Sequence, residues 1–135
     1  AGFFAAFLWG LLHFFGNIYI LSVTQVIIEY VLAFGFAGFA GFYAEPLHKV
    51  LLKKEKKKGY KYIWEASFIG TFARFFWHFI AGVIFWGSYA LWGMSPIIFS
   101  LVMNGASALA TSIVTGIILS ILFAKWPKLF MVETR

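Results

Sequence analysis

The chain has 135 residues, of which 62% are hydrophobic and only 12% are charged, and its formal net charge is +6. A soluble domain carries roughly 45–50% apolar and about 25% charged residues, so this composition excludes an ordinary soluble domain and predicts a membrane protein. The chain contains no cysteine, which excludes disulfides and thiolate metal sites.

The first predicted element is an apolar stretch over residues 1–12, which is shorter than the roughly 20 helical residues needed to cross the hydrocarbon. The chain begins at Ala1 and is already apolar there, so we expect it to lack a natural N-terminal part. No positive region precedes residues 3–15 and no small-residue cleavage site follows them, which argues against a signal peptide. A brief turn over residues 13–17 comes next.

Three later stretches are long enough to cross a bilayer as helices: residues 18–43, 66–92 and 96–124. A polar loop over residues 45–62 joins the first two, and a turn over residues 87–95 joins the last two. Ser95 and Pro96 predict a helix start, with serine as the N-cap and proline at the first helical position. Pro127 ends the last helix. The predicted fold is all-α, a single polytopic helical membrane bundle with about four helices.

The lysines predict how these helices are oriented. The loop over residues 45–62 carries seven of them against Glu45 and Glu55: Lys49, Lys53, Lys54, Lys56, Lys57, Lys58 and Lys61. The C-terminal tail is also basic, whereas the turns over 13–17 and 87–95 contain no lysine or arginine. By the positive-inside rule, the loop and the tail are cytoplasmic and the two turns face outward.

The run "KKEKKK" over residues 53–58 has a second interpretation, as a patch that binds nucleic acid or anionic lipid. We favour the topological role, and we expect the lipid bilayer but no nucleic acid as a partner. Trp64 and Trp126 are expected at the cytoplasmic interface and Trp92 at the outer one, where tryptophan anchors membrane helices.

Polar groups inside the predicted spans need a separate explanation, because an ionisable side chain there costs roughly 2.5–3.5 kcal/mol on insertion scales and usually marks a site. Glu29 lies about a dozen residues into its span, with Gln25 one turn earlier on the same face. A buried carboxylate requires a cation, a proton or several donors. Tyr30 and Tyr19 offer further hydrogen-bonding groups; the alternative is a structural glutamate that holds helices together.

In the stretch "FFWHFIAGVIFW", one histidine interrupts an apolar run. Arg74, His78, Gly82 and Trp86 recur every four residues, which places them on one slowly winding helical stripe. Gly82 would leave a notch in which a flat ring could stack on Trp86. Ordinary helix packing explains the same spacing equally well.

On the last span, Asn104 follows Ser100 by four residues and precedes Ser107 and Thr111. Small polar residues in membrane helices usually serve packing, but an asparagine amide can both donate to and accept from a ligand. Together with Glu29, His78 and Trp86, Asn104 predicts an outward-opening pocket for a flat, hydrogen-bonding, cationic small molecule, whose charge the aromatic faces would also attract.

These residues resemble the thiamine-specific S-component, the substrate-binding subunit of energy-coupling factor vitamin transporters. The segments that carry the resemblance are "LWGLLHFFGNIYILSVTQVIIEYVLAFGFAGFAG", "RFFWHFIAGVIFWGSYALWG", "SLVMNGASALATSIVTG" and "KWPKLF". The resemblance implies a six-helix membrane protein that captures thiamine from outside with high affinity. It also implies a transmembrane coupling subunit and two ATPase subunits as partners.

The resemblance implies a set of thiamine-binding positions, which are Trp9, Tyr19, Glu29, Tyr30, His78, Gly82, Trp86 and Asn104, and as further positions Arg74, Trp92 and Phe99. Arg74 stands where the family has a lysine, and Phe99 stands where it has a tyrosine. The family's first helix, its lid loop and most of its second helix are not matched.

The resemblance implies a transporter subunit rather than an enzyme, without a cofactor or a metal. The sequence has no Walker-type glycine loop, nucleophile elbow or HExxH pattern, so ATP would be hydrolysed by the partner subunits. Three alternatives stay open at this point. They are an S-component for another flat heterocyclic vitamin, a proton-coupled carrier that uses Glu29 and His78, and an intramembrane enzyme or metal site that uses those two residues with His13.

Overall fold

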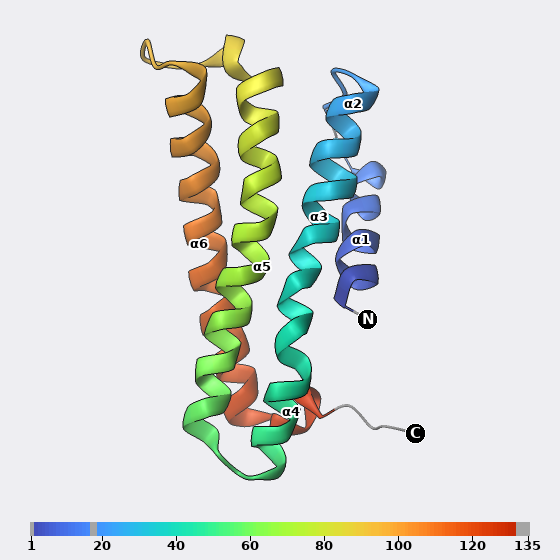
Figure 1. The fold of residues 1–135 in the computed structure, drawn as a ribbon, viewed down its shortest axis with the longest axis vertical. Coiled ribbons are helices and arrows are strands. Elements are labelled where there is room, and N and C mark those ends of the chain that lie inside the picture. The colour runs from blue at the N-terminus through green and yellow to red at the C-terminus, as the bar shows by residue number, and fades with distance from the viewer. Residues whose placement is uncertain (1, 17–18, 132–135) are drawn as a thin grey trace.

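The computed structural model describes residues 2–16 and 19–131, and every regular element within these ranges is a helix. Three long apolar helices dominate the fold (Figure 1): Val23–Leu52, α5 (Lys56–Phe85) and α6 (Pro96–Lys125). A shorter helix, α1 (Gly2–Leu12), continues into the turn η1 (His13–Phe15). The predicted all-α membrane bundle is confirmed.

The helix Val23–Leu52, called the composite helix below, changes its winding along its length. Its segments are α2 (Val23–Val26), the π-helical turn η2 (Ile27–Leu32), α3 (Ala33–Ala37), the 3-10 segment η3 (Gly38–Tyr43) and α4 (Ala44–Leu52). Short 3-10 turns also follow α5, as η4 (Gly87–Tyr89), and α6, as η5 (Pro127–Phe130). Single π turns inside helices occur frequently at functional sites.

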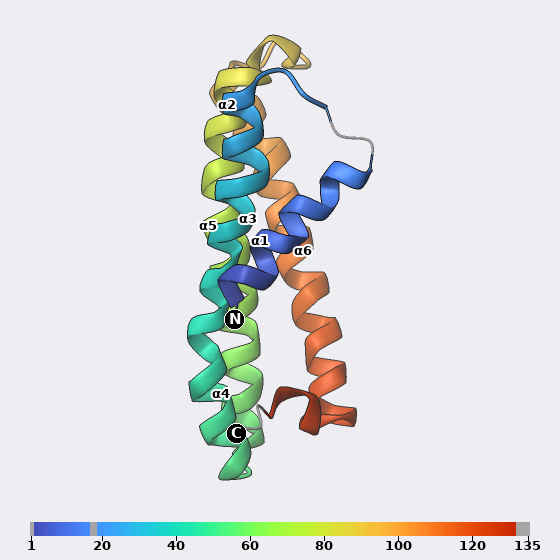
Figure 2. The same cartoon turned by 90° about the vertical axis from the view of Figure 1, so that its right-hand side faces the viewer.

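The helix α1 runs obliquely against the composite helix (Figure 2) and approaches it at glycines. A Cβ atom added at Gly38 would lie 2.4 Å from the Cα atom of Phe3, and one added at Gly10 would lie 2.2 Å from the Tyr30 carbonyl oxygen. Backbones that approach this closely are typical of membrane helix pairs, which rely on small residues at their interfaces.

The helices α5 and α6 lie side by side, and aromatic rings from each cover glycines of the other. A Cβ added at Gly59 would meet the Phe123 ring at 2.3 Å, and one added at Gly116 would meet the Trp64 ring at 2.6 Å. Large apolar side chains on the outer surface of α6, such as Ile113 and Ile121, are about half exposed. This surface suits contact with lipid tails.

The helices extend further into the polar connection than the sequence predicts. Residues 45–62 were expected to form a loop, but α4 continues to Leu52 and α5 begins at Lys56. The prediction is wrong because lysine and glutamate are good helix formers, and here they pair along the helices. The three exposed pairs are Glu45–Lys49 at 2.6 Å, Glu55–Lys58 at 2.5 Å and Lys61–Glu65 at 3.6 Å.

At the other end of the bundle, two further helix boundaries differ from those predicted from the sequence. The composite helix begins at Val23, so Glu29 lies within its first two turns rather than a dozen residues into a span. The helix α5 ends at Phe85, before the predicted limit at Trp92. Residues 1, 17 and 18, which the predicted spans and turn include, lie outside the described residues. The depth at which each helix meets the hydrocarbon stays a prediction.

Candidate ligand pocket

Glu29 is a buried carboxylate at the π-helical turn η2, with only 9% of its surface exposed. One carboxylate oxygen accepts a hydrogen bond from Trp86 Nε1 at 2.7 Å, and the other accepts one from Gln25 Nε2. Within the described parts of the chain, no lysine, arginine or histidine forms an ion pair with this carboxylate. Its negative charge is therefore met by two neutral N–H groups and by no cation.

Gln25 ties the segment before the composite helix to this carboxylate. It is fully buried; its side-chain oxygen accepts from the Leu21 N–H at 3.2 Å, and its amide nitrogen donates to the Tyr19 carbonyl, also at 3.2 Å. This segment carries the Tyr19 ring to 5.8 Å from the Trp86 ring. The i, i+4 spacing of Gln25 and Glu29 thus acts as predicted, by placing both side chains on one face.

A cavity of about 280 Å³ opens beside Glu29. Its lining comes from the composite helix, α5, η4 and α6, and consists of Glu29, His78, Gly82, Trp86, Tyr89, Phe99, Met103 and Asn104. Six of these eight positions are among the predicted binding residues. The three long helices, far apart in sequence, therefore bring a carboxylate, an imidazole, an indole and an amide to one cavity.

Gly82 lines this cavity, but its small size serves helix packing. A Cβ atom there would lie 2.2 Å from Ser100 Oγ and 2.8 Å from Asn104 Nδ2. The interpretation of Gly82 as an entry notch for a flat ring is wrong, because the absent side chain leaves room for α6 rather than for a ligand. Packing is the alternative that the spacing alone had left open.

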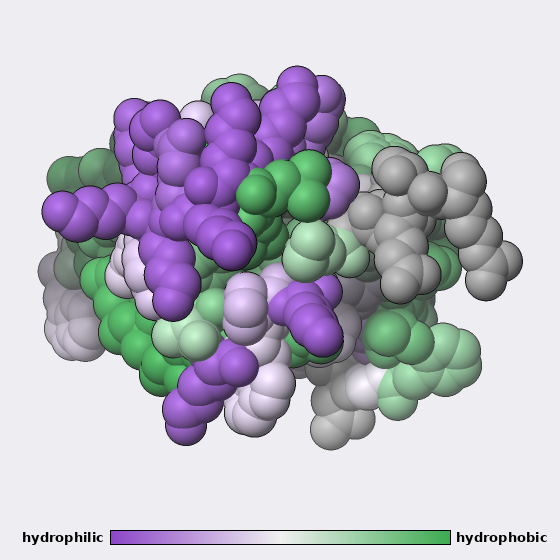
Figure 3. All heavy atoms as spheres, turned by 90° about the horizontal axis from the view of Figure 1, so that it is seen from below, coloured by the Kyte–Doolittle hydropathy of each residue, from purple (hydrophilic) through white to green (hydrophobic). Residues whose placement is uncertain are grey.

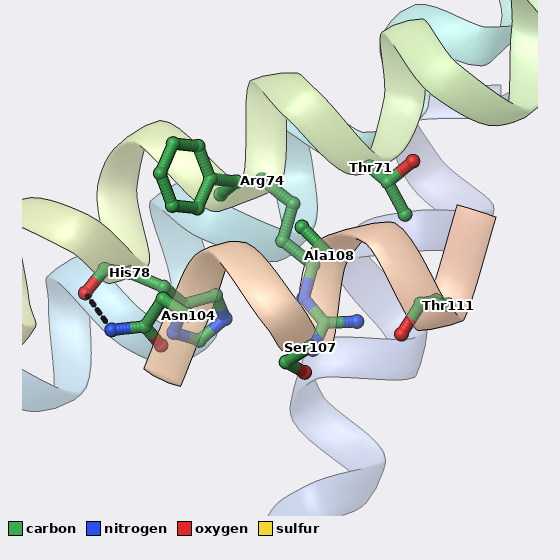
Figure 4. Close-up of a pocket in the computed structure, with 8 residues that line it drawn as sticks. Thr71, Arg74, His78, Asn104, Ser107, Ala108 and Thr111 are labelled. Carbon is green, nitrogen blue, oxygen red and sulfur yellow. Dashed lines mark hydrogen bonds between the residues drawn. The ribbon is translucent and has the colours of Figure 1, made fainter. Parts of the chain in front are cut away.

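Asn104 and Ser100 join α6 to α5. The Asn104 amide nitrogen donates to the His78 carbonyl at 3.2 Å, as Figure 4 shows, and to Ser100 Oγ at 3.1 Å. Ser100 Oγ in turn donates to the Phe79 carbonyl at 2.8 Å. One donor of the Asn104 amide is therefore used between helices and the other within α6, which leaves its carbonyl oxygen as the group that can accept from a ligand.

A second cavity of about 110 Å³ lies between α5 and α6 and shares His78 and Asn104 with the first (Figure 4). Arg74 and the hydroxyl side chains Thr71, Ser107 and Thr111 are among its lining residues. The Arg74 guanidinium also lies 4.7 Å from the centre of the Phe34 ring.

The imidazole of His78 is a buried polar group with an unpaired nitrogen among the described residues. Its Nε2 atom is buried and has no hydrogen-bond partner in the described part of the protein. Buried polar atoms are nearly always satisfied, so an unpaired one beside two cavities is well suited to a ligand contact.

Five predicted positions do not line the cavity beside Glu29: Tyr19 and Arg74, which are placed above, and Trp9, Trp92 and Tyr30. Trp9 is 58% exposed, with its ring 5.7 Å from His13, and Trp92 is 80% exposed in the turn before α6. The Tyr30 ring turns towards α1 and η1, 5.5 Å from the ring of Phe14. Their part in binding stays a prediction.

Tyr89 and Met103 line the cavity although the sequence did not single them out. Tyr89 reaches the Trp86 ring at 5.7 Å only because α5 ends and η4 turns the chain back. Met103 directly precedes Asn104, but an apolar residue on an apolar helix carries no signal that distinguishes a lining residue from a lipid-facing one.

Comparison with known proteins identifies close relatives. The profile of the family described as "Thiamine transporter protein" matches residues 1–131. The protein "Thiamine transporter ThiT" of Lacticaseibacillus paracasei is 38% identical over 96% of this chain and 66% of its own length. The protein of the same name from Bacillus subtilis is 32% identical over 84% of this chain and 59% of its own length.

A solved structure of ThiT from Listeria monocytogenes is 50% identical and superimposes with a TM-score of 0.92, over 96% of this chain and 72% of that one. The chain thus spans less than two thirds of the curated relatives' length. The profile match, the sequence identity and the shared structure agree with one another. This chain belongs to the thiamine transporter protein family.

Proposed function

We propose that this chain forms the larger part of a membrane-embedded subunit that captures thiamine for import across a bacterial cell membrane. The relatives in its family are named thiamine transporters, which supports a transport role rather than an enzymatic one. The cavity beside Glu29 is the proposed thiamine site.

The observation that carries this proposal is the buried carboxylate of Glu29, which has two neutral donors and no cationic partner among the described residues. Leaving a buried charge without an opposite charge is costly. The thiazolium ring of thiamine carries a fixed positive charge that no change of pH removes. Bound near Glu29, it would supply the missing countercharge.

The remaining groups suit the rest of the ligand. The Trp86 and Tyr89 rings offer faces for a flat heterocycle, and aromatic faces also attract cations. The Asn104 carbonyl could accept from the exocyclic amine of the pyrimidine, and the unpaired His78 Nε2 could donate or accept at a ring nitrogen. The cavity of about 280 Å³ lies just below the usual size range for small-molecule pockets, roughly 300–1,000 Å³.

A thiamine titration followed by tryptophan fluorescence tests the proposal. Stacking on Trp86 should quench emission saturably at micromolar thiamine or below, and Trp86→Phe should remove most of the quench. Trp126→Phe is the matched control, because Trp126 follows α6 at the far end of the bundle and should leave the quench intact. The absence of a saturable signal in the unmodified protein would reject thiamine binding.

We further propose that the lysine-rich end is cytoplasmic and that import requires a coupling subunit and two ATPase subunits. The lysine distribution supports the orientation, and Figure 3 shows hydrophilic side chains gathered at this end. The chain has no cysteine, so a single Lys57→Cys substitution provides a unique label. A membrane-impermeant maleimide should label it in inverted vesicles and not in intact cells. Copurification of the three partner subunits with the tagged protein tests the assembly.

A further inference from the structure

A third cavity, with an apolar interior and lysines among its lining residues, lies at the opposite end of the bundle from Glu29. It has a volume of about 220 Å³ between α4, the start of α5, the end of α6 and η5. Its apolar lining includes Val50, Leu51, Phe123 and Met131, and its rim includes Lys54, Lys56 and Lys128. The thiamine proposal uses none of these residues.

The backbone of the connection between α4 and α5 holds Lys54 at this rim. The Lys54 N–H donates to the Leu51 carbonyl at 3.0 Å, and the Glu55 N–H donates to the Val50 carbonyl at 2.9 Å. This pair of bonds is a Schellman motif, whose residue in the left-handed conformation is usually glycine. Here that residue is Lys54, with φ of 56°. A lysine thus occupies a position where glycine would be easier to accommodate.

The charges at the rim leave a net attraction for an anion. Glu55 also lines the cavity, but its carboxylate pairs with Lys58 at 2.5 Å, and this pairing lowers the pKa of Glu55. In the described residues, none of the three rim lysines forms an ion pair with a carboxylate. Three lysines without a carboxylate partner in the described chain therefore line a largely apolar cavity.

We propose that this cavity binds an anionic glycerophospholipid, with part of an acyl chain in the apolar interior and the phosphate between Lys54 and Lys128. The cavity, with a volume of about 220 Å³, has room for a short length of acyl chain. Lysines next to a membrane helix attract anionic headgroups. The site thus gives the run "KKEKKK" a binding role besides its effect on orientation.

The test compares lipids added to the delipidated protein in neutral detergent, by thermal unfolding and by native mass spectrometry. Phosphatidylglycerol should raise the unfolding temperature and remain bound, whereas phosphatidylcholine and inorganic phosphate should not. Equal effects of the two lipids would overturn the proposal, because the lysines would then play no part. An equal effect of inorganic phosphate would identify a simple anion site and would overturn it too.

Two substitutions locate the headgroup. Lys54→Gly removes an ammonium group at a position that glycine prefers, so the fold should be retained. Combined with Lys128→Gln, it should weaken phosphatidylglycerol binding about 25-fold, at about fivefold for each lysine. The control Lys53→Gln with Lys57→Gln removes the same charge from residues that do not line the cavity. An equal loss in the control would mean general charge attraction and would overturn the site.

A cavity-filling variant tests the acyl chain independently. Leu51→Trp places a large ring in the apolar interior and should abolish the thermal shift caused by phosphatidylglycerol. A full shift in a folded variant would overturn the proposed acyl-chain position. None of these residues lies at the thiamine cavity, so thiamine titration should be unchanged in every variant. Failure of the lipid site is therefore distinguishable from failure of the thiamine site.

Discussion

Replacing Glu29 with glutamine should separate a ligand-binding carboxylate from a structural one. The substitution keeps the size of the side chain and one oxygen for the Trp86 N–H, which now donates at 2.7 Å. It removes the negative charge, which has no cationic partner in the described chain. Two opposite effects follow, one on thiamine affinity and one on the stability of the ligand-free protein.

The effect on affinity follows from the lost attraction between charges. Unit charges about 4 Å apart attract by about 4 kcal/mol at an effective dielectric constant of about 20. The glutamine oxygen keeps part of this attraction through its dipole, so we expect Glu29→Gln to weaken thiamine binding about 100- to 1,000-fold. An uncharged isostere, in which carbon replaces the thiazolium nitrogen, should lose about tenfold at most.

The effect on the ligand-free protein should have the other sign. Burying an ion costs several kcal/mol, and Glu29→Gln relieves this cost. The new amide nitrogen faces Gln25 Nε2, which leaves one donor unsatisfied at about 1–3 kcal/mol. The variant should therefore unfold at the same temperature as the unmodified protein or at a higher one.

Isothermal titration with both ligands and thermal unfolding without ligand test these expectations. A lower unfolding temperature together with equal losses for both ligands would refute charge recognition. Glu29 would then be a structural glutamate that holds the helices together.

Three further substitutions have expected outcomes. Gly82→Ala forces its Cβ against Ser100 Oγ, at 2.2 Å, and should destabilise the protein by about 1–3 kcal/mol in thermal unfolding. The added change Ser100→Gly should recover only part of this loss, because it also removes the Ser100 hydrogen bonds. No loss in the single variant would contradict the packing role. Trp86→Phe removes the N–H donated to Glu29 and should weaken thiamine about tenfold in calorimetry, whereas unchanged affinity would exclude this ring from the site. Gly10→Ala places a Cβ 2.2 Å from a carbonyl oxygen of the composite helix and should lower the unfolding temperature; an unchanged value would show that α1 shifts at little cost.

Much of the fold could be predicted from the sequence because the bilayer makes local composition decisive. Backbone groups in hydrocarbon must bond within the helix, so long apolar stretches such as Pro96–Lys125 become helices whatever surrounds them. The limits of the other helices were harder to predict. Residues 45–62 appeared to be a loop because of their charge, but charged residues at the end of a membrane helix can continue it into water.

The candidate site, like the fold, could be predicted from the sequence only in part. Polar residues stand out in an apolar membrane span, because placing them there costs free energy. Glu29, His78 and Asn104 could therefore be singled out from the sequence alone. Only the packing of three helices decided that they share a cavity, that Gly82 makes room for Ser100, and that the Tyr30 ring turns towards α1. These outcomes depend on bringing together residues as far as 75 positions apart, since Glu29 and Asn104 line the same cavity. Composition sets the cost of burying a group, whereas tertiary packing determines its neighbours.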